Sequence, residues 1–302
     1  MRNQKPYFPD QLRRNTAWRW RLCLLLLALA VPATALGEAL LWRVEAPGAD
    51  VAPSYLFGTM HSDDPRVADP PAAVTQALSA SRLLLLELDL GAPEIALAPL
   101  AMILPPGQTL DGLLDEDTYR RAQAAMRERG YPPAAVDRMR PWAVAVTLAM
   151  PPVQTGRYLD LVLYEQALAQ GLAVQGLERI AEQLGVFEGL SVAEQAALLR
   201  LSLDEYGREA AAFEALHQAY LARDLDRLVT LSTETFARLP PALAASFEAA
   251  ILTARNRRMA ERAAPALAAG GAFVAVGALH LAGDDGLVAR FRALGYRLTP
   301  LY

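Results

Sequence analysis

The sequence has one cysteine and one lysine in 302 residues, and both lie close to the N-terminus, at Cys23 and Lys5. The chain beyond them can therefore form no disulfide and has no thiolate metal ligand and no cysteine nucleophile. The lack of lysine also excludes Schiff-base and serine–lysine mechanisms there. Histidine is scarce too, so chemistry that needs an imidazole must use one of three residues, His61, His217 or His280.

Several common catalytic motifs are also missing. The sequence has no Gly-x-Ser-x-Gly, His-Glu-x-x-His, Gly-x-x-x-x-Gly-Lys or Gly-x-Gly-x-x-Gly pattern. These absences argue against the α/β-hydrolase, zincin, P-loop and dinucleotide-binding classes. Nothing in the sequence points to a Ser-His-Asp triad.

Residues 1–35 have the pattern of a secretory signal peptide. Arginines precede an apolar run from Leu22 to Val31, and Ala33-Thr34-Ala35 forms an Ala-x-Ala cleavage site. The apolar run is too short to span a bilayer, which takes about 20 residues. We predict an exported protein, periplasmic or secreted, with no stable membrane span after leader cleavage. An uncleaved N-terminal anchor is the alternative.

Cleavage of this leader would leave an acidic protein. Residues 1–35 hold six of the 29 basic groups and one of the 33 acidic groups, so the remainder carries a net charge of −9. An acidic exported protein is a poor ligand for nucleic acid. We therefore expect no nucleic-acid partner.

Strand patterns cluster at the two ends of the chain, with one near the middle, around a large region of helical pattern. Helices are expected at 115–129 and 158–170 and, with breaks, from 180 to 269. The first two predicted strands are expected to pair as a hairpin. The predicted strands are 40–45, 54–57, 82–90, 172–176, 273–276 and 295–302. The expected fold is α/β, a central β-sheet with a large helical insertion, in a single domain covering 40–302.

Two histidines each follow a glycine that closes a predicted strand. Gly58 precedes His61, and Gly277 precedes His280, at the same spacing. Glycine tolerates the backbone angles of a sharp exit from a strand. Residues just past such a turn lie at the rim of the sheet, where α/β folds bind ligands. The pattern predicts two imidazoles at one rim, as a metal site or an acid/base pair, although each could be a hydrogen-bonded turn residue.

Glu87 lies in a leucine-rich run that suits a strand covered on both faces. A buried carboxylate costs several kcal/mol unless it is neutralised, paired or metal-bound. Together with His61 and His280 it would form a shell of the kind that holds Zn, Mn, Fe or Co. The alternatives are a carboxylate that reaches solvent and an ion pair with an arginine such as Arg255.

Further polar residues could assist this centre. Glu178 follows the predicted strand 172–176, and could be a ligand, a general base or an acid at a helix N-terminus. Arg255 and Asn256 open an arginine-rich segment that could orient a carboxylate or an oxyanion, although such runs usually form a solvated helix face.

Two residues are expected to have ordinary structural roles. Asp160 has the position of a first-turn helix acid. His217 lies in mid-helix and is expected to be structural or exposed.

These residues make the sequence resemble the TraB/PrgY/GumN family, which is related to the Tiki metalloproteases. The matching segments follow the family's order over almost the whole chain beyond residue 40. They are 55–61, 86–89, 158–160, 176–178 with Gln183, 255–256, and 276–281 with Gly283 and Gly286. The resemblance implies a core similar to the erythromycin-esterase and ChaN-like folds, with the paired Gly-x-x-His motifs and a glutamate at the active site. For the Tiki branch it implies metal-dependent peptide cleavage.

We therefore expect an exported metal-dependent hydrolase, a peptidase acting on a peptide or protein. His61, His280 and Glu87 would hold a divalent ion (Mn, Co or Zn) whose bound water attacks the carbonyl. The expected catalytic residues are Glu87, Glu178, Arg255 and Asn256. Two functions stay open beside it: a non-catalytic binding protein for a peptide, a metal or haem, and a metal-free His/Glu hydrolase of the erythromycin-esterase type.

Overall fold

The computed structural model describes residues 39–48 and 50–302. The predicted leader, residues 1–35, lies outside the described residues. No helix in the described part of the chain combines the length and the apolar character that crossing a bilayer requires.

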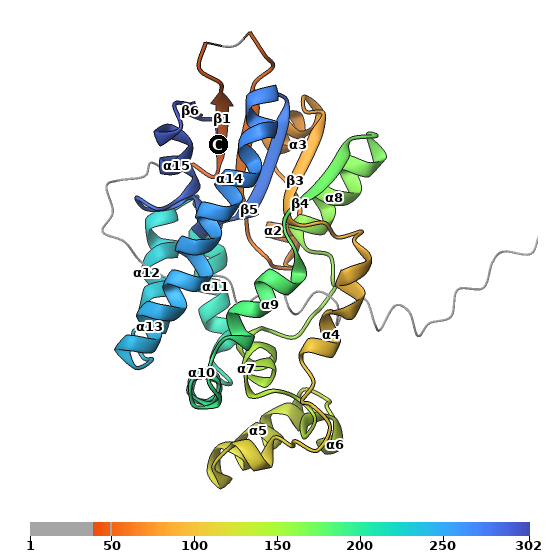
Figure 1. Ribbon diagram of the computed structural model, residues 1–302, viewed down its shortest axis with the longest axis vertical. Helices are drawn as coiled ribbons and strands as arrows, with labels where there is room; N and C mark the ends of the chain where they lie inside the picture. Colours follow the sequence, from red (N-terminus) through yellow and green to blue (C-terminus); the bar gives the residue numbers. More distant parts are fainter. Residues whose placement is uncertain (1–38, 49) are drawn as a thin grey trace, which may run out of the picture.

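A mixed six-stranded sheet organises the described residues, with strand order β4-β3-β5-β2-β1-β6 (Figure 1). Four neighbouring strands are parallel: β4 (Ala173–Glu178), β3 (Leu83–Leu88), β5 (Ala272–Gly277) and β2 (Ser54–Thr59). The remaining strands, β1 (Leu41–Glu45) and β6 (Arg297–Pro300), pair antiparallel with each other, and β1 also pairs antiparallel with β2. The α/β class, the predicted strands and the N-terminal hairpin are confirmed.

The central strands are covered on both faces, because nearly every residue of β3 and β5 is buried. Continuous apolar runs of this kind are typical of parallel strands between layers of helices. Helix α14 (Ala254–Ala269) contacts β4 and β5 and passes in front of the sheet in Figure 1. Helices α3 (Ala72–Ser79) and α8 (Leu159–Ala169) pack on β2 and on β3 and β4, respectively.

Two helical segments separate the parallel strands and fill the lower half of Figure 1. Short helices follow β2 and precede β6: α2 (Pro65–Ala68) and α15 (Leu287–Ala293). The segment between β3 and β4 contains η2 (Pro93–Leu97), α4 (Ala98–Ala101), η3 (Asp111–Leu113), α5 (Glu116–Glu128), α6 (Pro133–Val136), α7 (Pro141–Ala149) and α8. The segment between β4 and β5 contains α9 (Ile180–Glu188), α10 (Val192–Glu205), α11 (Glu209–Leu221), α12 (Leu225–Phe236), α13 (Pro241–Glu248), the π-helical turn η4 (Ala249–Thr253) and α14. The predicted helical insertion is confirmed.

The carboxyl ends of β3, β4, β5 and β2 share one edge of the sheet, because these strands are parallel. Leu88 is in register with Glu178, and Thr59 is in register with Gly277. The residues that follow β2 and β5, including the two histidines, therefore leave the sheet at neighbouring positions of that edge, which is where α/β folds bind ligands.

The first of the two motif glycines has a different role from the one that the sequence predicts. Gly58 lies inside β2 rather than closing it, and its φ is not positive. A Cβ atom on Gly58 would come within 3.0 Å of Cα of Ala278, in the 3-10 turn η5 (Ala278–Leu281). The glycine is therefore needed for close packing between β2 and η5. Gly277 does end β5.

Candidate active site at the carboxyl edge of the sheet

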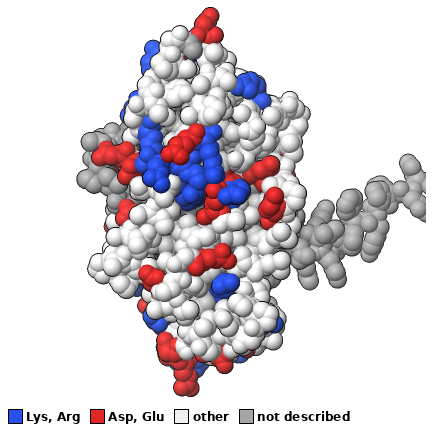
Figure 2. Space-filling model, viewed as in Figure 1, with Lys and Arg blue, Asp and Glu red and all other residues white. Residues whose placement is uncertain are grey.

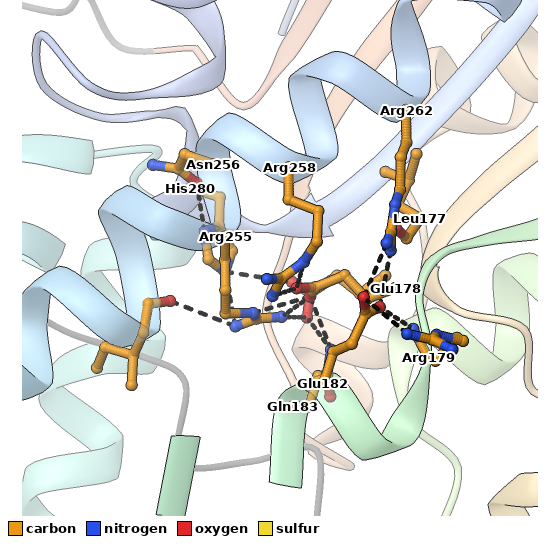
Figure 3. A network of polar contacts seen from close by, with 12 residues as sticks. Leu177, Glu178, Arg179, Glu182, Gln183, Arg255, Asn256, Arg258, Arg262 and His280 are labelled. Atoms are coloured by element: carbon orange, nitrogen blue, oxygen red, sulfur yellow. Dashed lines mark hydrogen bonds and ion pairs between the residues drawn. The ribbon is translucent and has the colours of Figure 1, made fainter. Parts of the chain in front are cut away.

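Glu87, on β3, forms an ion pair with the buried guanidinium of Arg255. Arg255 comes from α14 and lies beside Glu178 (Figure 3). Arg255 Nη2 donates to Glu87 Oε2 at 2.7 Å, and the Gly277 N–H donates to Oε1 at 2.7 Å. Burial raises the pKa of Glu87, but the Arg255 charge and the Gly277 hydrogen bond outweigh it and lower the pKa to about 2. Glu87 is therefore an ionised carboxylate with both oxygens hydrogen-bonded.

Glu178 holds Arg255 in place from the other side. It is the last residue of β4, not a residue beyond the strand as predicted, and its side chain is fully buried. Arg255 Nε donates to Glu178 Oε2 at 2.8 Å, while Arg258 bonds Oε1 through Nε at 3.1 Å and through Nη2. Gln183 Nε2 bridges Glu178 and Glu87 at 3.2 Å each. With its oxygens taken by two arginines, Glu178 serves to position the guanidinium groups; its role as a base stays a prediction.

His280 is neutral and its tautomer is fixed by its neighbours. Arginine can only donate, so Arg255 Nη1, 3.1 Å away, requires His280 Nε2 to accept. His280 Nδ1 then donates to Asn256 Oδ1 at 2.6 Å, and Asn256 Nδ2 donates to the Asp285 carbonyl at 3.0 Å. Burial, followed by the Arg255 charge, lowers the pKa of His280 to about 4. Glu87 Oε1 lies 3.6 Å from the same Nε2.

Arg255 is thus the centre of this cluster, and none of its side chain is exposed. It lies two residues after the π-helical turn η4, and its Nη1 also donates to the carbonyl of Ile251 within that turn, at 3.4 Å. Such π turns occur frequently at functional sites. Burial lowers the pKa of Arg255, but Glu87 and Glu178 outweigh it and raise the pKa. The expectation that arginines on this helix form a solvated face is wrong for Arg255.

His61 lies in a separate part of the edge. Its ring stacks on Tyr158, with centroids 4.3 Å apart, and Nδ1 lies 3.4 Å from Asp160 Oδ2. Thr59 Oγ1 donates to the other Asp160 oxygen at 2.9 Å, which fixes that carboxylate. Within the described residues, His61 Nε2 is buried and has no hydrogen-bond partner. The arrangement leaves Nε2 as the atom available to a ligand or a substrate.

The three predicted metal ligands do not form a compact set. Their donor atoms are not all within 4.8 Å of one another, a separation that a shared ion would require. In addition, Arg255 occupies the His280 lone pair and one Glu87 oxygen, so a cation already sits where the ion would have to bind. These residues do not fit a metal as they are arranged, and a metal at His61, His280 and Glu87 stays a prediction.

A different group of ligand-type side chains is a candidate for a divalent ion. In the described part of the chain, Asp64, Glu214 and His217 bring three such atoms within 4.8 Å of one another. However, Arg66 bonds both carboxylates, with Nη2 at 2.6 Å from Asp64 Oδ2 and from Glu214 Oε2. An ion would have to displace this guanidinium, so the group is an ion-pair cluster in this structure.

Charged side chains also gather at the rim of the site. Figure 2 shows arginine and acidic side chains gathered on the face where α14 and α9 lie. Arg262 pairs with Glu182 at 2.7 Å and also donates to the Leu177 carbonyl, and Arg179, next to Glu178, is largely exposed. The exposed face beside the Glu178–Arg255 pair is therefore rich in guanidinium groups.

The structure brings five of the predicted site residues into one cluster and places His61 apart from it, and their catalytic roles stay predictions: His280, Glu87, Glu178, Arg255 and Asn256. Sequence reasoning missed two partners. Arg258 bonds Glu178, and Asp160 faces His61 instead of acting only as a first-turn helix acid. The sequence contains an indication of each of these partners. Arg258 lies about one helical turn after Arg255, and Asp160 lies within a segment that carries the family resemblance.

Comparisons with known proteins agree with this architecture. The model of the TraB/PrgY/gumN family matches residues 40–300. The chain is also similar to a curated protein named metalloprotease TIKI2, from Danio rerio, with 30% identity over 187 residues. That alignment covers 52% of this chain and 36% of the relative, so it spans about a third of the relative's length. No solved structure matches the chain significantly.

Proposed function

The chain belongs to the TraB/PrgY/gumN family, and from that premise we propose that it is a hydrolase that cleaves a peptide or protein at the carboxyl edge of the sheet. The observation that carries the proposal is the fully buried Arg255, which bonds Glu87, Glu178 and His280 together. A buried ion network of this kind costs free energy of desolvation and is weak evidence for stability alone. Strongly shifted pKa values in such a cluster are typical of functional sites.

His280 is the proposed general base: its Nε2 would take a proton from the water that attacks the peptide carbonyl, and the carbonyl oxygen would take up the negative charge. The pKa of His280, about 4, is too low for efficient proton removal at neutral pH, and the Arg255 charge is one cause of that low value. When the substrate oxygen becomes negative, it can take the hydrogen bond that Arg255 Nη1 now gives to His280. This frees Nε2 and partly cancels the positive charge, so the pKa of His280 rises as the charge on the substrate develops.

Arg255 is the proposed electrophilic group. Its guanidinium is held rigidly by Glu178 and Glu87, so it can stabilise an oxyanion without reorganising. Asn256 fixes the tautomer of His280 by accepting from Nδ1. Glu87, 3.6 Å from Nε2, stabilises the imidazolium that forms when His280 takes a proton.

The relative's printed name suggests a divalent metal, and metal dependence, with Mn, Co or Zn as the ion, is the second form of the proposal. Because the ligand geometry above does not fit an ion without movement of Arg255 or Arg66, no step is assigned to one. A chelator separates the two forms: cleavage that survives it selects the metal-free His/Glu mechanism, and cleavage that is lost and restored by Mn, Co or Zn selects the metalloenzyme.

The test uses the full-length protein and a fluorogenic peptide library. We expect His280→Gln and Glu87→Gln to lower kcat/KM by at least about 100-fold while the protein stays folded. Glu45→Gln, which alters an ion pair on β1, is the matched control. If the unaltered protein cleaves no peptide but retains one from a lysate, a binding protein replaces the hydrolase. Export to the periplasm or medium is part of the proposal, and cell fractionation tests it.

A further inference from the structure

Ser62 and His217 form a hydrogen-bonded pair at a second place in the molecule. Ser62 follows β2 and His217 lies on α11, and both side chains are buried. Ser62 Oγ lies 2.8 Å from His217 Nε2, and the Asp64 N–H lies 3.1 Å from the same oxygen. Of the two expectations for His217, structural or exposed, its burial excludes the exposed one.

Acidic side chains complete the arrangement on the far side of the ring. His217 Nδ1 lies 3.6 Å from Asp64 Oδ2 and 3.7 Å from Glu214 Oε2. The hydrogen bonds from Arg66 are the main cause that lowers the pKa of each carboxyl to about 2, so both are ionised. An ionised carboxylate beside Nδ1 favours the tautomer with the proton on Nδ1, which leaves Nε2 to accept from Ser62. Catalytic hydrogen bonds are often this loose before substrate binds.

The serine opens towards a pocket. Ser62, His61, Tyr158, Met150 and Phe213 are among the residues that line it. A larger, mainly apolar hollow adjoins this pocket, since Met150 and Phe213 line both. Further apolar lining of the hollow comes from α7, α10, α11 and α12. A hydroxyl activated by an imidazole thus lies next to space suited to an apolar chain.

From this geometry we propose that Ser62, His217 and Asp64 form a nucleophilic triad that hydrolyses carboxylic esters with an apolar acyl group. The site is distinct from the Glu87–Arg255–His280 cluster, and its chemistry does not depend on the function proposed there. Glu214 and Arg66 are positioning residues that hold the Asp64 carboxylate beside the ring.

The reaction conserves atoms and charge. His217 Nε2 takes the Ser62 hydroxyl proton as Oγ attacks the ester carbonyl; the ester C–O bond breaks, and the leaving alcohol takes the proton from His217. Water then attacks the acyl-serine, gives one proton to His217, and releases the carboxylic acid as Ser62 recovers its proton. Asp64 stays ionised throughout and stabilises the imidazolium.

The first experiment is covalent labelling of the full-length protein with an alkyl fluorophosphonate. The serine oxygen attacks the phosphorus atom of this reagent and displaces fluoride. We expect mass spectrometry to locate the adduct at Ser62, and His217→Gln to slow labelling by about 100-fold or more. Ser246→Ala, which changes a serine bonded to a backbone carbonyl on α13, should leave the labelling rate unchanged. A folded, unlabelled Ser62 would overturn the proposal, and this readout needs no variant that might misfold.

The second experiment tests the acyl class with p-nitrophenyl octanoate and p-nitrophenyl acetate. We expect the octanoate to be the better substrate and Ser62→Ala to lower its kcat/KM by about 100-fold or more. Leu201→Trp fills part of the apolar hollow, so it should reduce the preference for octanoate over acetate. An unaltered preference for octanoate in Leu201→Trp would contradict the proposed substrate class. Full activity in Ser62→Ala would contradict Ser62 as the nucleophile. Cleavage of peptides is not measured here, so failure of this proposal leaves the peptidase proposal standing.

Discussion

Arg255 Nη1 lies 3.1 Å from His280 Nε2, so a permanent cation faces the lone pair of a buried imidazole. The same guanidinium bonds Glu87 and Glu178, which come from neighbouring parallel strands. One side chain from α14 therefore fixes the positions of two carboxylates and the protonation state of one histidine.

Arg255→Lys should lower kcat/KM on the best library peptide by about 100-fold, the loss typical of removing one oxyanion donor. Lysine keeps the charge but cannot bond two carboxylates and an imidazole with one planar fork. Steady-state kinetics beside a thermal melt measures the effect. Arg120→Lys changes an exposed arginine that pairs with Asp117 on α5, and it should have normal kinetics. Equal rates in the two variants would remove Arg255 from the mechanism.

Glu178→Gln should cost about 3–5 kcal/mol of unfolding free energy, because it leaves the buried Arg255 and its neighbour Arg258 without their shared counter-ion. Glu182→Gln is the matched control: Glu182 pairs with Arg262 at the partly exposed rim, where an ion pair contributes about 1 kcal/mol or less. Urea titration of both variants gives the two values. A loss at Glu178 no larger than at Glu182 would mean that the buried pair does not hold the cluster together.

Acid should destabilise the protein in two steps, an upper one that belongs to His280 and a lower one that Glu87 shares with Asp64 and Glu214. The folded pKa of His280 is about 4 against an ordinary 6.5, so the unfolded chain binds the proton first and stability falls as pH drops from about 6.5 to 4. That shift corresponds to a loss on the order of 3 kcal/mol. Glu87, with a folded pKa of about 2 against 4.5, contributes stability above pH 4.5 that is lost as pH falls towards 2.

The measurement is the unfolding free energy by urea titration from pH 8 to pH 2. His280→Gln should flatten the upper part of the profile, between pH 6.5 and 4, because the titrating group is gone. A variant profile that runs parallel to the original across this range would show that another group causes the loss.

Much of the fold and part of the site could be predicted because they depend on local patterns. The leucine run of β3 has the uniform burial of a covered parallel strand, and the spacing of the two Gly-x-x-His motifs placed both histidines at one edge. Glu178 was proposed from its place after a predicted strand and Asn256 from its arginine-rich segment, and both also lie in segments that carry the family resemblance. Strand burial and strand direction could be predicted because they are encoded within a few residues.

Contacts between distant segments could not be predicted in this way. Nothing in Arg255-Asn256-Arg257-Arg258 shows that Arg255 is buried while Arg257 is exposed, because that depends on where α14 crosses the sheet. Ser62 and His217 are equally remote from each other in sequence, and their pairing requires α11 to pack beside the end of β2. The sequence motif therefore indicated His61 and gave no sign of its neighbour Ser62.

Gly58→Ala tests why the first motif glycine is needed. A Cβ at this position would meet Cα of Ala278 at 3.0 Å and the Leu281 side chain at 3.1 Å, so β2 and η5 would have to separate. We expect a loss of about 1–3 kcal/mol of unfolding free energy, as for other overpacked cores, and reduced peptidase activity, because η5 carries His280. Gly185→Ala, on α9, is the control: a Cβ there meets nothing within 4 Å, and alanine should stabilise the helix by about 0.5–1 kcal/mol. If Gly58→Ala were as stable and active as Gly185→Ala, close packing of β2 on η5 would not be what positions His280.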